Sequence, residues 1–136
     1  MKTLFALLLL MTLSSMSLFA QKIEFEALEI NYGDIAKGAN GVRVFRFKNT
    51  GTAPLIISDV QKTCGCTSPS FTNTPVMPGE TGEIQVKYDT QRLGAFSKFV
   101  TVHSNALEQQ MVQLKIFGNI KESENLPECQ KTLFKN

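Results

Sequence analysis

The sequence has little histidine, no tryptophan and few cysteines. His103 is the only histidine among 136 residues, so one chain can form neither a histidine general-base relay nor a pair of histidine metal ligands. It lies near the end of an alternating segment, where we expect a surface or strand-end residue. Histidine chemistry is therefore not the basis of a function.

Motifs for common hydrolytic and nucleotide chemistries are also missing. No serine lies in a G-x-S-x-G context, and no glycine-rich loop leads into a helix. Asp34, Asp59 and Asp89 lie in or beside clusters of turn-forming residues, where aspartate commonly hydrogen-bonds to the backbone. The sequence argues against an enzyme, and we expect no cofactor.

The chain has no strong net charge and no charged cluster. Its 14 Lys and Arg residues face 12 Asp and Glu residues, for a formal net charge of +2, and the basic residues are scattered. A nucleic-acid-binding surface needs a basic patch or stripe. Nucleic acid is therefore excluded as an expected partner.

The N-terminal segment is typical of a secretory signal peptide. Residues 1–20 begin with a lysine at position 2, continue through an apolar run to Leu13, and end in a small and polar stretch at Ala20. The apolar run is too short and too interrupted for a good membrane span, which needs roughly 20 apolar residues. We expect an exported, periplasmic or secreted protein with no stable membrane span after cleavage.

The remaining residues are enough for one compact domain. Segments with a hydrophobic period of two predict half-buried strands, and clusters of turn-forming residues separate them. We expect seven strands: 23–30, 42–48, 55–60, 67–72, 84–88, 96–102 and 111–117. This spacing favours an all-β, antiparallel sandwich over residues 21–120, followed by a polar tail over residues 121–136.

The alternation also predicts the hydrophobic core. The residues expected to fill it are Val44, Phe45, Phe47, Leu55, Ile57, Ile84, Val86, Phe99, Val102, Leu114 and Ile116.

Several short motifs occur in an order that matches a known family. They are Phe45-Arg-Phe47-Lys-Asn49-Thr-Gly51, Pro54-Leu55-Ile-Ile57, Cys64-Gly65-Cys66-Thr67, Pro78-Gly79-Glu80, Ile84-Gln-Val86-Lys-Tyr88-Asp-Thr90, Gly94 and Ser104-Asn105. Together they resemble the bacterial family called "domain of unknown function 1573", over about residues 25–120. The resemblance implies an immunoglobulin-like sandwich, similar to abnormal-spindle and hydin modules, carried by exported bacterial proteins. It implies no enzyme activity.

The Cys64-Gly65-Cys66 motif is the sharpest chemical feature of the chain. Residues i and i+2 of a strand face the same side, so both sulfurs would point together. A bridge between them closes a very small ring, and strained, exposed disulfides are easily reduced. Two thiolates also bind soft metals, although a closed zinc site needs four ligands. A structural role, in which the motif turns the chain from one strand to the next, also stays open beside a redox role and copper or zinc binding.

Cys129 is the third cysteine and lies in the polar tail. Three cysteines allow at most one bridge within the chain, so disulfides do not form the framework of the fold. In an immunoglobulin-like sandwich the strand from Leu55 and the strand ending near Ile120 run parallel, which predicts that the Cys64-Gly65-Cys66 motif and the start of the tail lie about 10 Å apart. A bridge from Cys129 to Cys64 or Cys66 is then sterically feasible, and the alternative is a free or intermolecular thiol.

Outside the three cysteines, the sequence describes only a scaffold. The leading hypothesis is a non-catalytic binding or structural module of the bacterial envelope that holds a protein partner. The alternative is a thiol-based function, either redox exchange or soft-metal binding, carried by Cys64 and Cys66.

Overall fold

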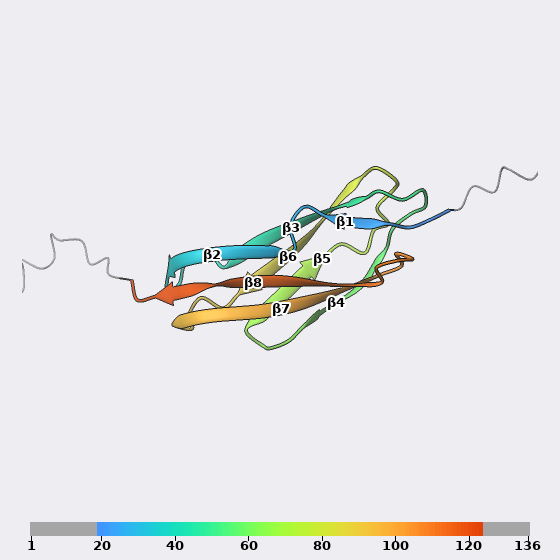
Figure 1. The fold of residues 1–136 in the computed structure, drawn as a ribbon. Helices are drawn as coiled ribbons and strands as arrows, with labels where there is room; N and C mark the ends of the chain where they lie inside the picture. The colour runs from blue at the N-terminus through green and yellow to red at the C-terminus, as the bar shows by residue number, and fades with distance from the viewer. Residues whose placement is uncertain (1–18, 124–136) are drawn as a thin grey trace, which may run out of the picture.

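The computed structural model describes residues 19–123, which form two stacked β-sheets and no helix (Figure 1). The strands are β1 (Ile23–Phe25), β2 (Glu29–Ala36), β3 (Val42–Asn49), β4 (Ile57–Lys62), β5 (Thr67–Phe71), β6 (Thr81–Tyr88), β7 (Gly94–Ser104) and β8 (Met111–Lys121). Sheet A has the order β1-β3-β6-β5, and sheet B has the order β2-β8-β7-β4. The all-β, immunoglobulin-like sandwich expected from the sequence is confirmed.

One neighbouring pair in sheet B is parallel. β2 pairs with β8 in the parallel sense, with a register shift between Asn31 and Asp34, whereas the other pairs in both sheets are antiparallel. The first described residues and the end of β8 lie at opposite ends of the sandwich (Figure 1).

The structure has eight strands where the sequence predicted seven. The segment expected to be one strand, 23–30, is divided between β1 in sheet A and β2 in sheet B. Phe25 and Ile30 both contact the core, but they are five residues apart, and one continuous strand would turn them to opposite faces. The chain instead crosses from one sheet to the other through exposed residues 26–28.

The expected core is buried except for two residues. Val44 is 38% exposed and Phe99 is 40% exposed, so both assignments were wrong. Val44 directly precedes the inward-facing Phe45, and Phe99 directly precedes the inward-facing Val100, so alternation places both on the outer faces. The prediction had placed Phe99 and Val102 on one face although an odd spacing separates them.

A fully buried asparagine holds the turn after β3. Asn49 donates from Nδ2 to the carbonyl oxygens of Ala53 (2.8 Å) and Val76 (2.9 Å), and its Oδ1 accepts from the Gly51 N–H. Three hydrogen bonds satisfy this buried amide, which would otherwise destabilise the core. The Asn-Thr-Gly motif thus fixes the exit of β3.

The pairing between β1 and β3 continues toward the N-terminus beyond the named strands. The Thr50 N–H donates to the Lys22 carbonyl (3.0 Å), and the Thr52 N–H donates to the Ala20 carbonyl (2.7 Å). The Ala20 N–H in turn donates to Thr52 Oγ1. A Cβ on Gly51 would lie only 2.1 Å from the Ala20 carbonyl oxygen, so this close approach requires glycine.

The strands on either side of β7 do not end at the same level. β4 and β8 both pair antiparallel with β7 and so run parallel to each other, as expected. However, Lys62 at the end of β4 lies opposite Val100 of β7, and Val100 in turn lies opposite Leu114 of β8. β8 continues from there past Ile120. At about 3.4 Å per residue, Ile120 is about 20 Å further along the strand direction. β4 and β8 therefore end at different levels, and the predicted distance of about 10 Å between the Cys64-Gly65-Cys66 motif and the start of the tail stays a prediction.

No helix within residues 19–123 is long and apolar enough to cross a membrane. The expected signal peptide, except for its last two residues, and the greater part of the polar tail, including Cys129, lie outside the described residues.

Candidate functional site

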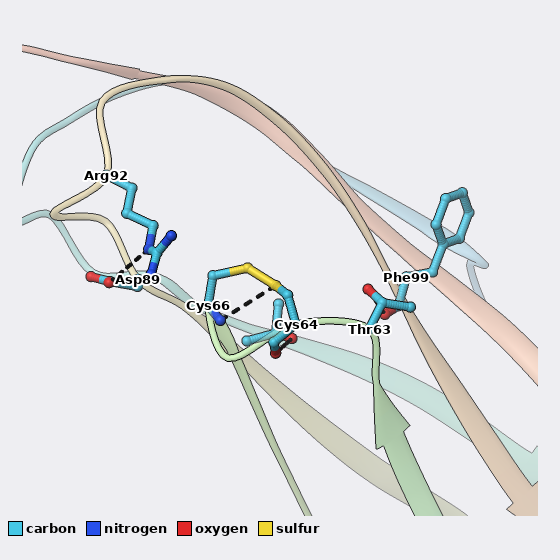
Figure 2. Close-up of a disulfide and its surroundings, with 7 residues drawn as sticks. Thr63, Cys64, Cys66, Asp89, Arg92 and Phe99 are labelled. Carbon is cyan, nitrogen blue, oxygen red and sulfur yellow. Dashed lines mark hydrogen bonds and ion pairs between the residues drawn. A yellow bond between two sulfur atoms is a disulfide. The ribbon is translucent and has the colours of Figure 1, made fainter.

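The Cys64-Gly65-Cys66 motif lies where the chain crosses between the two sheets. β4 ends at Lys62 in sheet B, and β5 begins at Thr67 in sheet A. The motif thus turns the chain from one strand to the next at a corner of the sandwich, as the structural hypothesis predicted, and it is not part of an extended strand (Figure 2).

In the structure a disulfide joins Cys64 to Cys66 (Figure 2). The two Cα atoms are 5.3 Å apart, within the range of roughly 4.4 to 6.8 Å found in ordinary disulfides. The two residues are buried to different extents: Cys66 is 5% exposed and belongs to the core, whereas Cys64 is half-buried at the edge of the core. Gly65 between them is exposed.

Backbone and hydroxyl groups hold the corner in place. Thr63 Oγ1 donates to the Phe99 carbonyl (3.1 Å), and Thr67 Oγ1 donates to the Cys64 carbonyl (3.3 Å). The Cys66 N–H donates to Cys64 Sγ at 3.3 Å. These contacts attach the corner to β7 and to itself, so the position of the sulfurs is set by both sheets.

The turn after β6 lies beside Cys66. The Asp89 N–H donates to the Cys66 carbonyl (2.9 Å), and the Asp89 carboxylate pairs with Arg92 Nε at 3.3 Å (Figure 2). Both charged side chains are exposed, so this ion pair contributes little to stability. Asp89 also caps its own turn by accepting from the Gln91 N–H, which is the backbone role expected of it.

The sequence-predicted residues do not assemble a larger site within residues 19–123. That part of the chain has no group of three or more His, Cys, Asp or Glu side chains able to hold a metal ion. Cys129 lies outside it, and because Cys64 and Cys66 are joined to each other, neither is available for the bridge to Cys129 considered from the sequence. His103 is the penultimate residue of β7, with Asp59 and Met111 opposite it on the neighbouring strands, and its buried Nε2 has no hydrogen-bond partner.

A shallow groove of about 580 Å³ on the outer face of sheet B was not predicted from the sequence. We call it the β8 groove. It is lined by Asn31, Gly33, Asp34, Ala95, Phe96, Ser97, Lys115, Phe117, Gly118 and Asn119.

Small residues of β7 and β8 make the β8 groove hollow, and Phe117 provides its aromatic surface. Ala95 and Ser97 face outward on β7, and Ser97 lies opposite Phe117 on β8. Phe99 is the next outward residue of β7, so it is a diagonal neighbour of Phe117 at about 7 to 8 Å. The exposed Phe99 and the half-buried Phe117 therefore occupy diagonal positions on the outer face of sheet B, and we call this pair the apolar strip.

Two ion pairs lie beside the β8 groove. Lys115 Nζ lies 3.6 Å from Glu29 and 5.0 Å from the Phe117 ring centroid. Asp34 pairs with Lys121 at 2.6 Å and accepts from Asn119 Nδ2 at 3.1 Å. The hydrogen bonds from Lys121 and Asn119 lower the pKa of the Asp34 carboxyl.

The sequence contains a weak signal for this groove. In β8 the apolar residues Ile116 and Phe117 are adjacent, so one of them must face outward. An outward phenylalanine beside small residues on the paired strand indicates a hollow apolar surface, but the pairing of Ser97 with Phe117 is known only from the register.

Comparison with protein-family models decides the family. The model described as "Protein of unknown function (DUF1573)" matches residues 23–120, which is most of the chain. The chain belongs to the DUF1573 family. No curated protein matches it.

Solved structures share the fold of this DUF1573 domain at low sequence identity. A protein of unknown function from Porphyromonas gingivalis W83 has a TM-score of 0.66 at 14% identity, over 73% of this chain and 46% of that chain. The PapD-like domain 7 of human CEP192 has a TM-score of 0.63 at 12% identity, over 77% of this chain and 89% of that chain. The periplasmic chaperone SfaE has a TM-score of 0.54 at 11% identity, over 79% of this chain and 62% of that chain.

This chain therefore spans about half the length of the P. gingivalis protein. At these identities the likeness shows a PapD-like, immunoglobulin-like fold and no activity.

Proposed function

We propose that this DUF1573 protein is an exported, non-catalytic module of the bacterial envelope that binds a protein partner through the outer face of sheet B. The observation that carries the proposal is the apolar strip of Phe99 and Phe117 beside the β8 groove. An outward-facing aromatic pair, with Phe99 exposed and Phe117 half-buried, suits contact with another protein surface, because aromatic residues supply much of the energy of interface cores.

The described chemistry favours binding over catalysis. Catalytic sites combine a nucleophile or base with a partner at hydrogen-bond distance. His103 Nε2 has no such partner, and the exposed ion pairs of Asp34, Asp89 and Glu29 join ordinary surface side chains. The β8 groove holds no nucleophile adjacent to a base among its lining residues.

Two features support the choice of partner and compartment. Residues 1–20 have the pattern of a secretory signal peptide, so the folded domain would meet its partner outside the cytoplasm. SfaE is a periplasmic chaperone, and its likeness to this chain is consistent with a sandwich that presents a surface to another protein.

The experiment places a photo-crosslinking amino acid at position 99 or at position 44 in cells that make the full-length protein. Position 44 is the control because Val44 is similarly exposed on the outer face of sheet A. We expect a protein adduct in the envelope fraction from position 99, and its loss when Phe117→Ser is added. Equal adducts from both positions, or an adduct only in the cytoplasmic fraction, would contradict the proposal.

A further inference from the structure

We propose that the Cys64–Cys66 disulfide exchanges with thiols of proteins or small molecules outside the cytoplasm, with Cys64 as the sulfur that is attacked and Cys66 as the resolving thiol. This activity is separate from partner binding by sheet B and does not depend on it.

The difference in burial decides which sulfur an incoming thiol can reach. Thiol–disulfide exchange requires a thiolate to approach one sulfur of the bond directly. Cys66 is 5% exposed within the core, whereas Cys64 is half-buried beside the exposed Gly65. A Cβ added to Gly65 would meet no atom within 4 Å, so the space above this corner is open. Cys64 is therefore the more accessible end of the bond, whereas attack at Cys66 would require displacing the core.

The local hydrogen bonds favour the same assignment. The Cys66 N–H points at Cys64 Sγ from 3.3 Å and would stabilise negative charge on that sulfur after reduction. Cys66 has the opposite environment, because burial in an apolar core disfavours a thiolate. In the reduced motif, Cys64 is thus suited to act as the nucleophile, and Cys66 is suited to stay protonated until the mixed disulfide has formed.

The exchange balances as a two-electron transfer. A thiolate forms a bond to Cys64 Sγ while the Cys64–Cys66 bond breaks, and Cys66 leaves as a thiolate that takes a proton from water. A second thiolate then attacks the sulfur of the first thiol in this mixed disulfide and releases Cys64. Two thiols are oxidised to one disulfide, and the Cys64–Cys66 pair is reduced.

Proximity makes the mixed disulfide short-lived. Cys66 is two residues from Cys64, with 5.3 Å between their Cα atoms, so its sulfur is present at a high effective concentration. Attack by Cys66 closes the ring again and expels the bound thiol. Removing Cys66 should therefore trap the adduct on Cys64.

The test uses the full mature chain with Cys129→Ser, so that the tail thiol does not react. Two matched proteins carry either Cys66→Ser or Cys64→Ser, and each is mixed with oxidised glutathione under native conditions. We expect a stable mixed disulfide in the Cys66→Ser protein, forming at least about 10-fold faster than in the Cys64→Ser protein, as followed by intact mass. Equal rates, or faster reaction of the Cys64→Ser protein, would overturn the assignment.

A second measurement needs neither of these two substitutions. The Cys129→Ser protein with both motif cysteines is mixed with reduced glutathione, quenched in acid after short intervals, and mapped by peptide mass. We expect the transient adduct only on Cys64, together with oxidised glutathione and a reduced pair. An adduct on Cys66, or a bond that stays intact in the folded protein but is reduced after unfolding in urea, would refute the exchange.

Discussion

Phe47 packs closely against its neighbour across the sheet. It is 2% exposed and lies opposite Gly82, where an added Cβ would be 2.3 Å from the phenyl ring. The ring occupies the space that a side chain on β6 would otherwise fill. Phe47→Ala should therefore lower the free energy of unfolding by about 3 to 5 kcal/mol in urea titration.

The matched control is Val44→Ala, on the outer face of the same strand. Because Val44 is 38% exposed, its truncation should cost less than about 1 kcal/mol. Similar losses for the two variants would place β3 in a different register from the one described.

Tyr32 links stability to alkaline pH. Its hydroxyl donates to the Gly41 carbonyl at 2.7 Å, and burial raises the pKa of Tyr32 to about 12, although the nearby Arg43 guanidinium acts in the opposite direction. The folded state therefore favours the neutral phenol. Its stabilising effect is complete below the unfolded pKa of 10.0 and is lost as pH rises toward 12.

We expect the urea concentration at the unfolding midpoint of the native protein to decrease as the pH is raised from about 8 to about 11. This decrease should be smaller in the Tyr32→Phe protein. Burial also raises the pKa of Tyr88, so some pH dependence should remain in this variant. An unchanged pH dependence in Tyr32→Phe would show that the buried phenol is not its source.

At the scale of elements, the N-terminal pairing makes stability depend on where the mature chain begins. The expected signal-peptide cut after Ala20 would remove the residue that exchanges two hydrogen bonds with Thr52. Each such bond is worth about 1 kcal/mol. A protein beginning at Gln21 should therefore unfold at a lower urea concentration than one beginning at Phe19.

A protein beginning at Ala20 is the control, because Phe19 is 74% exposed and its removal should have little effect. If all three proteins unfold together, the pairing beyond β1 does not stabilise the domain.

At the scale of the whole molecule, the edge strands of both sheets have features that disfavour pairing with a strand of another molecule. β1 has three residues, β2 and β4 have register shifts, and β5 contains Pro69. The bond from the Asp89 N–H to the Cys66 carbonyl makes Pro69 and Val86 a pair without mutual hydrogen bonds, so the Pro69 nitrogen faces outward. Proline there removes a donor from the open edge.

Pro69→Val should increase self-association at high concentration, measured by light scattering after size-exclusion chromatography. Ser68→Val is the control, since the Ser68 N–H points toward β6 and the substitution adds apolar surface without adding an edge donor. Greater association of Ser68→Val would indicate that side-chain hydrophobicity, not the backbone edge, controls assembly.

The strands were predictable where alternation was regular and pairing was local. In β6 the buried residues Ile84 and Val86 were assigned to the core because apolar and polar residues alternate without interruption. In β3 the adjacent apolar residues Val44 and Phe45 break this alternation, and only the structure shows that Phe45 faces inward. In β7 two apolar residues, Phe99 and Val100, are adjacent, and only the pairing with β4 and β8 decides which one faces inward. The β8 groove was not predictable because its residues come from three strands.

The sequence by itself determined the all-β class, the family and most of the inward-facing residues, because a period of two and turn-forming residues act over a few neighbouring positions. The tertiary structure alone decided the crossing at residues 26–28, the parallel pairing of β2 with β8 and the unequal burial of Cys64 and Cys66. These features depend on which strands meet across the sandwich. Contacts between residues far apart in the chain set them, and a local pattern carries no information about such contacts.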